Sequence, residues 1–197
     1  MPKGIPLTEE EQIRRRREIF DAAVHLFLEK GFNETSLRAI AQAAGVGKST
    51  LYDYFRTKDD ILLSVLEDEL HSLTGKAQEI ARQEIGADEK LLQIIFAYMR
   101  YLAANEDFFM KLSLEVQRMA QGSQVRILRM RHAYQDVIRA VIEAGIQDGV
   151  FRPIDPLLAT RIILTAVSPA IYTTRPSGTR DQMMDGALSL LMQGLLA

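Results

Sequence analysis

The sequence has no cysteine at any of its 197 positions. A chain without cysteine forms no disulfide and no thiolate metal site, which excludes the zinc centres that depend on cysteine ligands. No apolar run approaches the ~18 residues that a membrane-spanning helix needs. The first residues, MPKGIPLTEEEQ, lack the hydrophobic stretch of a secretory signal. We therefore expect a cytoplasmic protein that has no membrane partner.

The chain also lacks a strong excess of charge. It carries 24 Lys and Arg against 26 Asp and Glu, a formal net charge of −2. Up to Lys58 there are ten basic and eight acidic residues, an excess of only two. Any binding to nucleic acid must therefore depend on where the basic side chains lie rather than on bulk charge.

Signs of catalysis are missing as well. His25, His71 and His132 are far apart, and none has a partner at the i+3 or i+4 spacing from which a metal site could be argued. Neither a nucleophile elbow nor a glycine-rich cofactor fingerprint occurs. We expect no catalytic residue, no metal and no cofactor, so the protein is not predicted to be an enzyme.

The most informative stretch is residues 36–58, SLRAIAQAAGVGKSTLYDYFRTK. Leu37, Ile40 and Ala44 recur at helical spacing, which predicts a short helix over about 36–44 with Ser36 or the preceding threonine as its cap. Gly45 provides the turn, because glycine enters left-handed conformations without a Cβ penalty. A second short helix over about 47–55 completes a helix-turn-helix.

The second helix has the residue mix of a recognition helix. Leu51 and Phe55 anchor one face, and hydrogen-bond donors cover most of the rest. The alternative is a small surface helix with a chance polar face. The residues expected to contact DNA are Ser36, Arg38, Gly47, Lys48, Ser49, Thr50, Tyr52, Tyr54 and Lys58. Lys58 joins them because a cation at a helix start, beside free backbone N–H groups, favours phosphate.

A phosphate-binding loop is a rival interpretation of the GKST sequence at 47–50. That motif needs a further glycine five positions before Gly47, where this chain has Gln42, and it needs a preceding strand. The preceding residues are predicted to be helical instead. The P-loop interpretation therefore fails.

Residues 20 to about 66 resemble the DNA-binding domain of the TetR/AcrR family of bacterial transcriptional regulators, and the match runs through FDAAVHLFLEKGFNETSLRAIAQAAGVGKSTLYDYFRTKDDIL. The GF turn, the AxxAGV turn and the TLYxYF helix occur in the family's order and spacing. The resemblance implies a helix-turn-helix domain over 1–58, with its N-terminal arm, and a C-terminal ligand-binding and dimerisation domain over 59–197. It also implies a homodimer that binds a palindromic double-stranded DNA operator.

The remaining residues read as helices separated by short breaks, so the predicted fold is all-α with about nine helices. A long helix from a Thr57 cap to about residue 83 links the two domains. One further helix, over about 155–174, should kink at Pro169. The basic run Arg14–Arg17 has two interpretations, a solvated helix face or a phosphate contact.

Aromatic and methionine side chains gather in the helices predicted between residues 88 and 148. They either form plain core or line a pocket for an apolar ligand with one polar end. In the resembling family the C-terminal bundle binds a small inducer, which makes a small hydrophobic effector the expected ligand. The candidate ligand residues are Phe96, Tyr98, Met99, Tyr101, Phe109, Met119 and Tyr134.

The last two predicted helices are rich in apolar residues, and the final one is apolar on too many sides for any of them to face water, which is typical of a helix that packs against another chain. The alternative is a terminal helix folded into its own core. In the family these helices form a four-helix dimer interface. The candidate interface residues are Ile163, Val167, Met184, Leu188, Leu191 and Leu195.

Together these features predict a ligand-responsive repressor that a small, largely apolar inducer releases from its operator. Two other classes stay open at this point. One is a helical small-molecule binding protein whose helix-turn-helix serves only packing, and the other is an all-α enzyme with its chemistry in the bundle. Retardation of a DNA fragment from the protein's own promoter region would separate the regulator from both.

Overall fold

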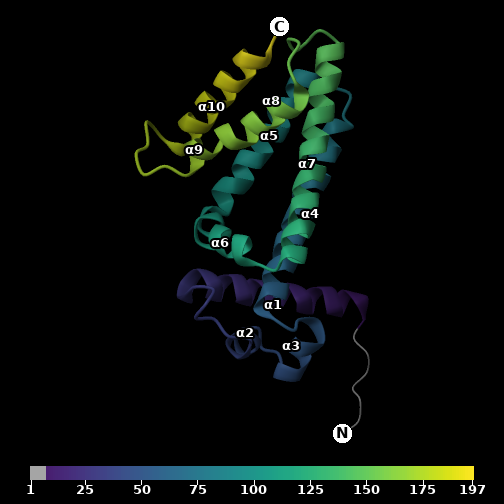
Figure 1. Cartoon of the computed structure of the whole chain (residues 1–197). Coiled ribbons are helices and arrows are strands. Elements are labelled where there is room, and N and C mark those ends of the chain that lie inside the picture. Colours follow the sequence, from purple (N-terminus) through teal and green to yellow (C-terminus); the bar gives the residue numbers. More distant parts are fainter. Residues whose placement is uncertain (1–7) are drawn as a thin grey trace. The chain divides into compact units, whose positions relative to one another are not determined.

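The computed structural model describes residues 8–197, except for the side chains of Phe109 and Ser113. Every regular element in this part is a helix, which confirms the predicted all-α class (Figure 1). The helices are α1 (Glu9–Lys30), α2 (Leu37–Ala43), α3 (Lys48–Tyr54), α4 (Lys58–Ala81), α5 (Ala87–Ala104), α6 (Glu106–Arg118), α7 (Gln121–Gln147), α8 (Pro156–Ala166), α9 (Ser168–Ile171) and α10 (Arg180–Leu195). None of the described helices is long and apolar enough to cross a membrane. The predicted N-terminal arm lies almost wholly outside the described residues.

Side-chain caps fix where several helices begin. The Thr8 hydroxyl accepts a hydrogen bond from the Glu11 N–H while the Glu11 carboxylate accepts one from the Thr8 N–H. The same reciprocal pair joins Thr57 and Asp60 at the start of α4, as the sequence predicted. Each pair satisfies two backbone donors that a helix start otherwise leaves unbonded.

The described part contains ten helices rather than about nine, because the expected kink at Pro169 is a full break. α8 ends at Ala166 and the four-residue α9 begins at Ser168. Proline has no N–H to donate to the carbonyl four residues earlier, and its ring clashes with that carbonyl. The chain therefore ends one helix and starts another.

The chain forms two compact units. Of the described residues, 8–66 and Met110–Gln124 make unit 1, and Glu67–Phe109 and Val125–Ala197 make unit 2. The helices α4, α6 and α7 therefore each contribute residues to both units. The predicted boundary after Lys58 falls within unit 1.

The core of unit 1 brings the first four helices together around fully buried side chains. Phe27 from α1, Ile40 from α2, Leu51 from α3 and Ile61 from α4 are each at most 1% exposed. The Phe32 ring, in the turn after α1, lies 4.8 Å from the Phe27 ring. This packing fixes α2 and α3 against α1.

The core of unit 2 lies between α5, α7, α8 and α10. Leu91, Met99, Ile138 and Ile163 are buried there, each at most 1% exposed. Buried Gly145 in α7 leaves the room in which the Phe151 ring packs against the helix backbone. Unit 2 is thus a helical bundle with an apolar core, so polar side chains that lie within this core are candidates for a functional role.

Candidate DNA-binding surface and effector site

Local backbone chemistry sets the angle between α2 and α3. The Ser36 hydroxyl accepts a hydrogen bond from the Ala39 N–H at 3.1 Å, which starts α2. Gly45 then adopts φ +63°, a conformation that strains any residue with a Cβ. The chain turns there and re-enters a helix directly after Gly47. This is the predicted helix-turn-helix.

The two faces of α3 differ as a recognition helix requires. Leu51 and Phe55 face the core of unit 1, whereas Lys48, Ser49 and Tyr52 are exposed. The Lys48 ammonium lies 5.7 Å from the centre of the Tyr52 ring, so the two side chains share one face. The polar remainder of the predicted set follows the same division: Ser36, Arg38 and Gly47 are exposed, and Thr50 and Tyr54 are half-buried.

The basic run in α1 is mostly engaged within the chain. Arg14 and Arg15 pair with Glu18 at 3.9 and 3.7 Å. The Arg16 guanidinium lies over the Phe20 ring, 5.2 Å from its centre. These contacts agree with a solvated helix face and leave phosphate contact by the run as a prediction.

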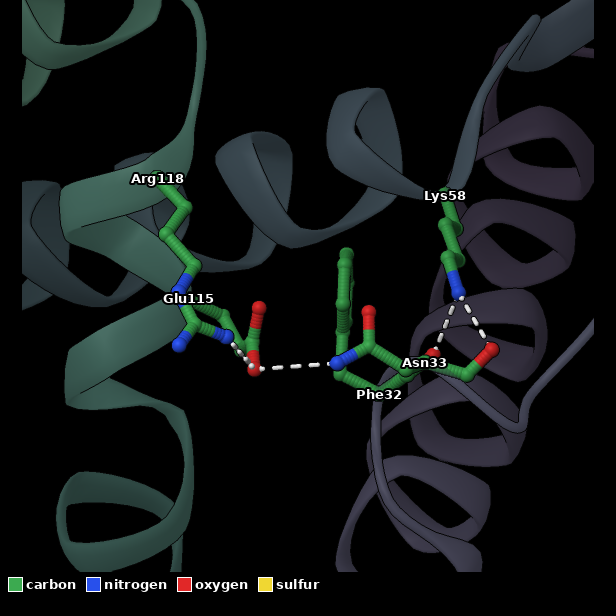
Figure 2. Close-up of polar contacts among 5 residues, drawn as sticks. All are labelled: Phe32, Asn33, Lys58, Glu115 and Arg118. Carbon is green, nitrogen blue, oxygen red and sulfur yellow. Dashed lines mark hydrogen bonds and ion pairs between the residues drawn. The ribbon is translucent and has the colours of Figure 1, made fainter.

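The position of Lys58 at a helix start predicts a contact with phosphate, but its side chain is bonded within the protein. Its ammonium donates hydrogen bonds to the backbone carbonyls of Phe32 and Asn33, at 2.9 Å to Asn33 (Figure 2). It also donates to the Thr35 carbonyl at 3.3 Å. It also lies 4.6 Å from the centre of the Phe32 ring. An ammonium has three protons, and all three are used here. A phosphate contact by Lys58 would require it to leave these carbonyls.

The same turn is held from α6. The Asn33 side-chain amide donates to Glu115, which also pairs with Arg118 at 3.3 Å (Figure 2). The Lys111 ammonium donates to the Leu28 carbonyl at 3.0 Å. The α1–α2 turn of unit 1 is thus bonded to the start of α4 and to the second half of α6. These contacts join residues more than 20 positions apart, so helical periodicity gives no signal of them.

Replacing Lys58 separates its two possible roles. We expect Lys58→Met to lower the free energy of unfolding by about 1–2 kcal/mol, since charge-assisted hydrogen bonds are lost from a partly exposed group. Chemical denaturation of the protein without DNA measures this, with the exposed Lys76→Met as control. Unchanged stability combined with weaker DNA binding would instead make Lys58 a phosphate contact.

The structure gathers some of the predicted ligand residues and separates others. Tyr98 and Tyr101 of α5 and Tyr134 of α7 lie in unit 2, where the rings of Tyr98 and Tyr134 are 5.7 Å apart. Met99 is buried in the same core. The outliers are Phe96, which is 38% exposed with Arg100 over its ring, Met119, which belongs to unit 1, and Phe109, whose side chain lies outside the described part.

Two residues that the sequence did not single out join this group. Tyr172, directly after α9, donates to the Leu102 carbonyl at 3.5 Å. Glu69 of α4 is hydrogen-bonded to Tyr101, and its half-buried position raises the pKa of its carboxyl. Burial also raises the pKa of Tyr98, Tyr101, Tyr134 and Tyr172, so all four phenols stay protonated donors. We call Glu69 and these four residues the tyrosine cluster.

The predicted interface residues mostly face inward. Ile163, Val167, Met184, Leu188 and Leu195 are at most 7% exposed in the core of unit 2, and Leu191 is half-buried. The apolar surface of α8 and α10 is instead formed by Leu158, Ile162 and Leu190, which are 55%, 53% and 75% exposed. A groove of about 240 Å³ runs beside these three side chains. The outward-facing apolar residues of these two helices are therefore not the ones named from periodicity, and a contact between copies through α8 and α10 stays a prediction.

In the described part of the chain, no three His, Asp or Glu side chains are placed to hold a metal ion. Three other features could carry a function, namely the exposed donors of α3, the tyrosine cluster, and the apolar surface of α8 and α10.

Comparison with known proteins agrees with this geometry. Residues 19–65 match the model of the bacterial regulatory proteins of the tetR family, and residues 84–195 match a tetracyclin repressor-like C-terminal domain. The transcriptional repressor KstR2 of Rhodococcus jostii is 30% identical over 185 residues, covering 92% of this chain and 91% of that protein. A fatty acid metabolism regulator protein of Bacillus subtilis is 25% identical over 182 residues, covering 90% and 94%. Among solved structures, the regulator FadR of Bacillus subtilis in complex with stearoyl-CoA has 25% identity and a TM-score of 0.77, covering 90% of this chain and 98% of that one.

Proposed function

The chain belongs to the TetR family of bacterial transcriptional regulators, and from this premise we propose that it is a homodimeric repressor. In this proposal, a small effector with an acyl or ketone group releases the repressor from its operator. The observation that carries the proposal is the helix-turn-helix. Its recognition helix α3 is fixed by Leu51 and turns Lys48, Ser49 and Tyr52 outward.

The exposed face of α3 supports the DNA-binding role. Lysine at the start of a recognition helix can read base edges in the major groove, and tyrosine hydroxyls along the flank can bind phosphates. Ser36 is already a helix cap through its oxygen lone pair, yet its hydroxyl proton stays available to a phosphate. In the proposed division of roles, Lys48 and Thr50 contact base edges, whereas Tyr52 and Tyr54 contact the phosphate backbone of the DNA.

The exposed apolar surface of α8 and α10 supports the dimer. Leu158, Ile162 and Leu190 leave a groove between two helices open, and a second copy with the same groove can fill it around a two-fold axis. Such a dimer suits a palindromic operator, because its two recognition helices must enter successive major grooves about 34–36 Å apart.

The tyrosine cluster supports the effector. Buried apolar side chains surround a few polar groups there, the arrangement typical of a small-molecule site. The relative FadR was solved with stearoyl-CoA, and KstR2 of Mycobacterium tuberculosis is described as a ketosteroid regulator. A largely apolar ligand that carries an acyl or keto group fits both the relatives and the cluster.

The helices α4 and α6 support a link between effector and DNA. Each contributes residues to both units, and each holds the α1–α2 turn, through Lys58 and through Glu115. An effector that binds more tightly to the protein when these helices are in one position increases the fraction of molecules with the helices in that position. It weakens DNA binding only as far as it prefers that state.

Retardation of DNA from the protein's own promoter region tests the proposal. We expect a specific complex that survives competition by unrelated DNA, and a footprint with two-fold symmetry. Failure to retard any promoter fragment at low salt would favour the helical binding protein or the all-α enzyme over the repressor.

A further inference from the structure

Four of the chain's six tyrosines meet in unit 2, contributed by α5, by α7 and by the residue that follows α9. Tyr98 is their common neighbour. Its ring contacts the Tyr134 ring at 5.7 Å and a 41° tilt, and its phenol acts electrostatically on Tyr101, Tyr134 and Tyr172. Four tyrosine side chains from three separate parts of the chain therefore gather in one region.

The hydroxyls differ in what they bind. Tyr101 is paired with Glu69, and Tyr172 donates to the Leu102 carbonyl. Among the described residues, neither Tyr98 nor Tyr134 has a hydrogen-bond partner for its hydroxyl. Tyr134 is only 4% exposed. Arg139 Nε is the only fully buried side-chain nitrogen or oxygen of the described residues that lacks a hydrogen-bond partner, so the hydroxyls of Tyr98 and Tyr134 are not sealed within the core, and two donors of the cluster are left open to a ligand.

The charges around the cluster restrict what that ligand can be. Glu69 is half-buried beside Tyr101, whereas no lysine or arginine of the described residues is buried. The cation that acts electrostatically on Tyr98 is Arg131, an exposed residue of α7. An anionic ligand group would sit near a carboxylate without a buried cation to offset its desolvation. An uncharged acceptor meets no such penalty.

We propose that Tyr98 and Tyr134 donate hydrogen bonds to an uncharged carbonyl oxygen of the effector, a thioester or a ketone, and that Glu69 discriminates against free carboxylic acids. The inference rests on the proposed function only in that an effector binds within unit 2. It adds the group that is recognised, the two donors and the basis for rejecting the free acid.

Calorimetric titration of the full chain without DNA tests the carbonyl contact. The probes are stearoyl-CoA and its S-stearyl thioether, which has a methylene in place of the carbonyl. We expect the thioether to bind about tenfold more weakly, the effect of a lost hydrogen bond to buried donors. Tyr134→Phe should weaken binding of the thioester about tenfold and leave binding of the thioether unchanged. Tyr172→Phe is the matched control, because its hydroxyl already bonds the Leu102 carbonyl, and it should preserve the preference for the thioester.

Stearate tests the discrimination by charge. It should bind more weakly than stearoyl-CoA, and Glu69→Gln should raise its affinity severalfold without changing that of the thioester. Any one of three results would overturn the inference. The first is equal affinity for the thioester and the thioether, and the second is an equal loss of affinity for both in Tyr134→Phe. The third is an affinity for stearate that Glu69→Gln does not change. The steroid 5α-androstan-3-one and its deoxy analogue 5α-androstane, which differ only in that one ketone, repeat the test for a ketone. If neither the thioester nor the ketone binds, the carbonyl assignment is wrong, whereas retardation of promoter DNA decides the regulatory function separately.

Discussion

Ile162→Glu should convert the protein from a dimer to a folded monomer. Ile162 is 53% exposed on α8, beside Leu158 and the open groove toward α10. A carboxylate at the centre of an apolar interface costs roughly 2–4 kcal/mol when it is left unpaired. Two-fold symmetry places it in both copies. Dimer affinity should therefore fall by a factor of roughly 1,000 or more, and operator affinity should fall with it. Light scattering gives the mass, and circular dichroism shows that the helices are kept.

Two further substitutions make this result specific. Leu92→Glu changes an equally large apolar residue, 43% exposed on α5, and should leave the dimer intact. Leu188→Glu places the charge in the chain's own core, where Leu188 is 7% exposed, and should lower thermal stability rather than dissociate a folded dimer. A folded dimer from both Ile162→Glu and Leu190→Glu would mean that the copies associate through another face.

Lys48→Ala should weaken binding to the operator by about 1–3 kcal/mol, roughly 5- to 150-fold, if the lysine reads a guanine. On a scrambled duplex the loss should be smaller, because only the general charge attraction is removed. Fluorescence anisotropy on the two duplexes at one fixed salt concentration measures both losses.

Tyr54→Phe is the comparison for Lys48→Ala. Tyr54 is half-buried at the end of α3, with its ring 6.3 Å from that of Phe55, and it is expected to contact phosphate. Loss of its hydroxyl should weaken binding to both duplexes by the same factor. Identical losses for the two variants on both duplexes would contradict the assigned division of roles.

The helix-turn-helix could be predicted from the sequence because its determinants are local. Gly45 is the residue that a left-handed turn requires, Ser36 is a cap, and Leu51 with Phe55 marks the inner face of α3. Each of these signals lies within a few residues of the structure it specifies. The all-α class and the caps at Thr57 and Asp60 were predictable for the same reason.

Other features depend on tertiary neighbours, which periodicity does not identify. The Lys58 ammonium turns to the carbonyls of the α1–α2 turn, over 20 positions earlier, and away from a local helix-start role. Apolar residues of α8 and α10 alternate between the core and the surface, so Ile163 is buried while Ile162 is exposed. Glu69 belongs to the tyrosine cluster only because α4 passes α5, and no spacing within α4 predicts that.

Titration of stearoyl-CoA into a preformed complex of the protein with its labelled promoter fragment tests the central claim most directly. If the protein is an effector-released repressor, fluorescence anisotropy should fall to the value of free DNA over the same concentration range in which calorimetry shows binding. By reciprocal linkage, saturating operator should weaken the affinity for stearoyl-CoA by the same factor. An anisotropy that stays constant while stearoyl-CoA demonstrably binds would contradict the account, because the two sites would then be uncoupled.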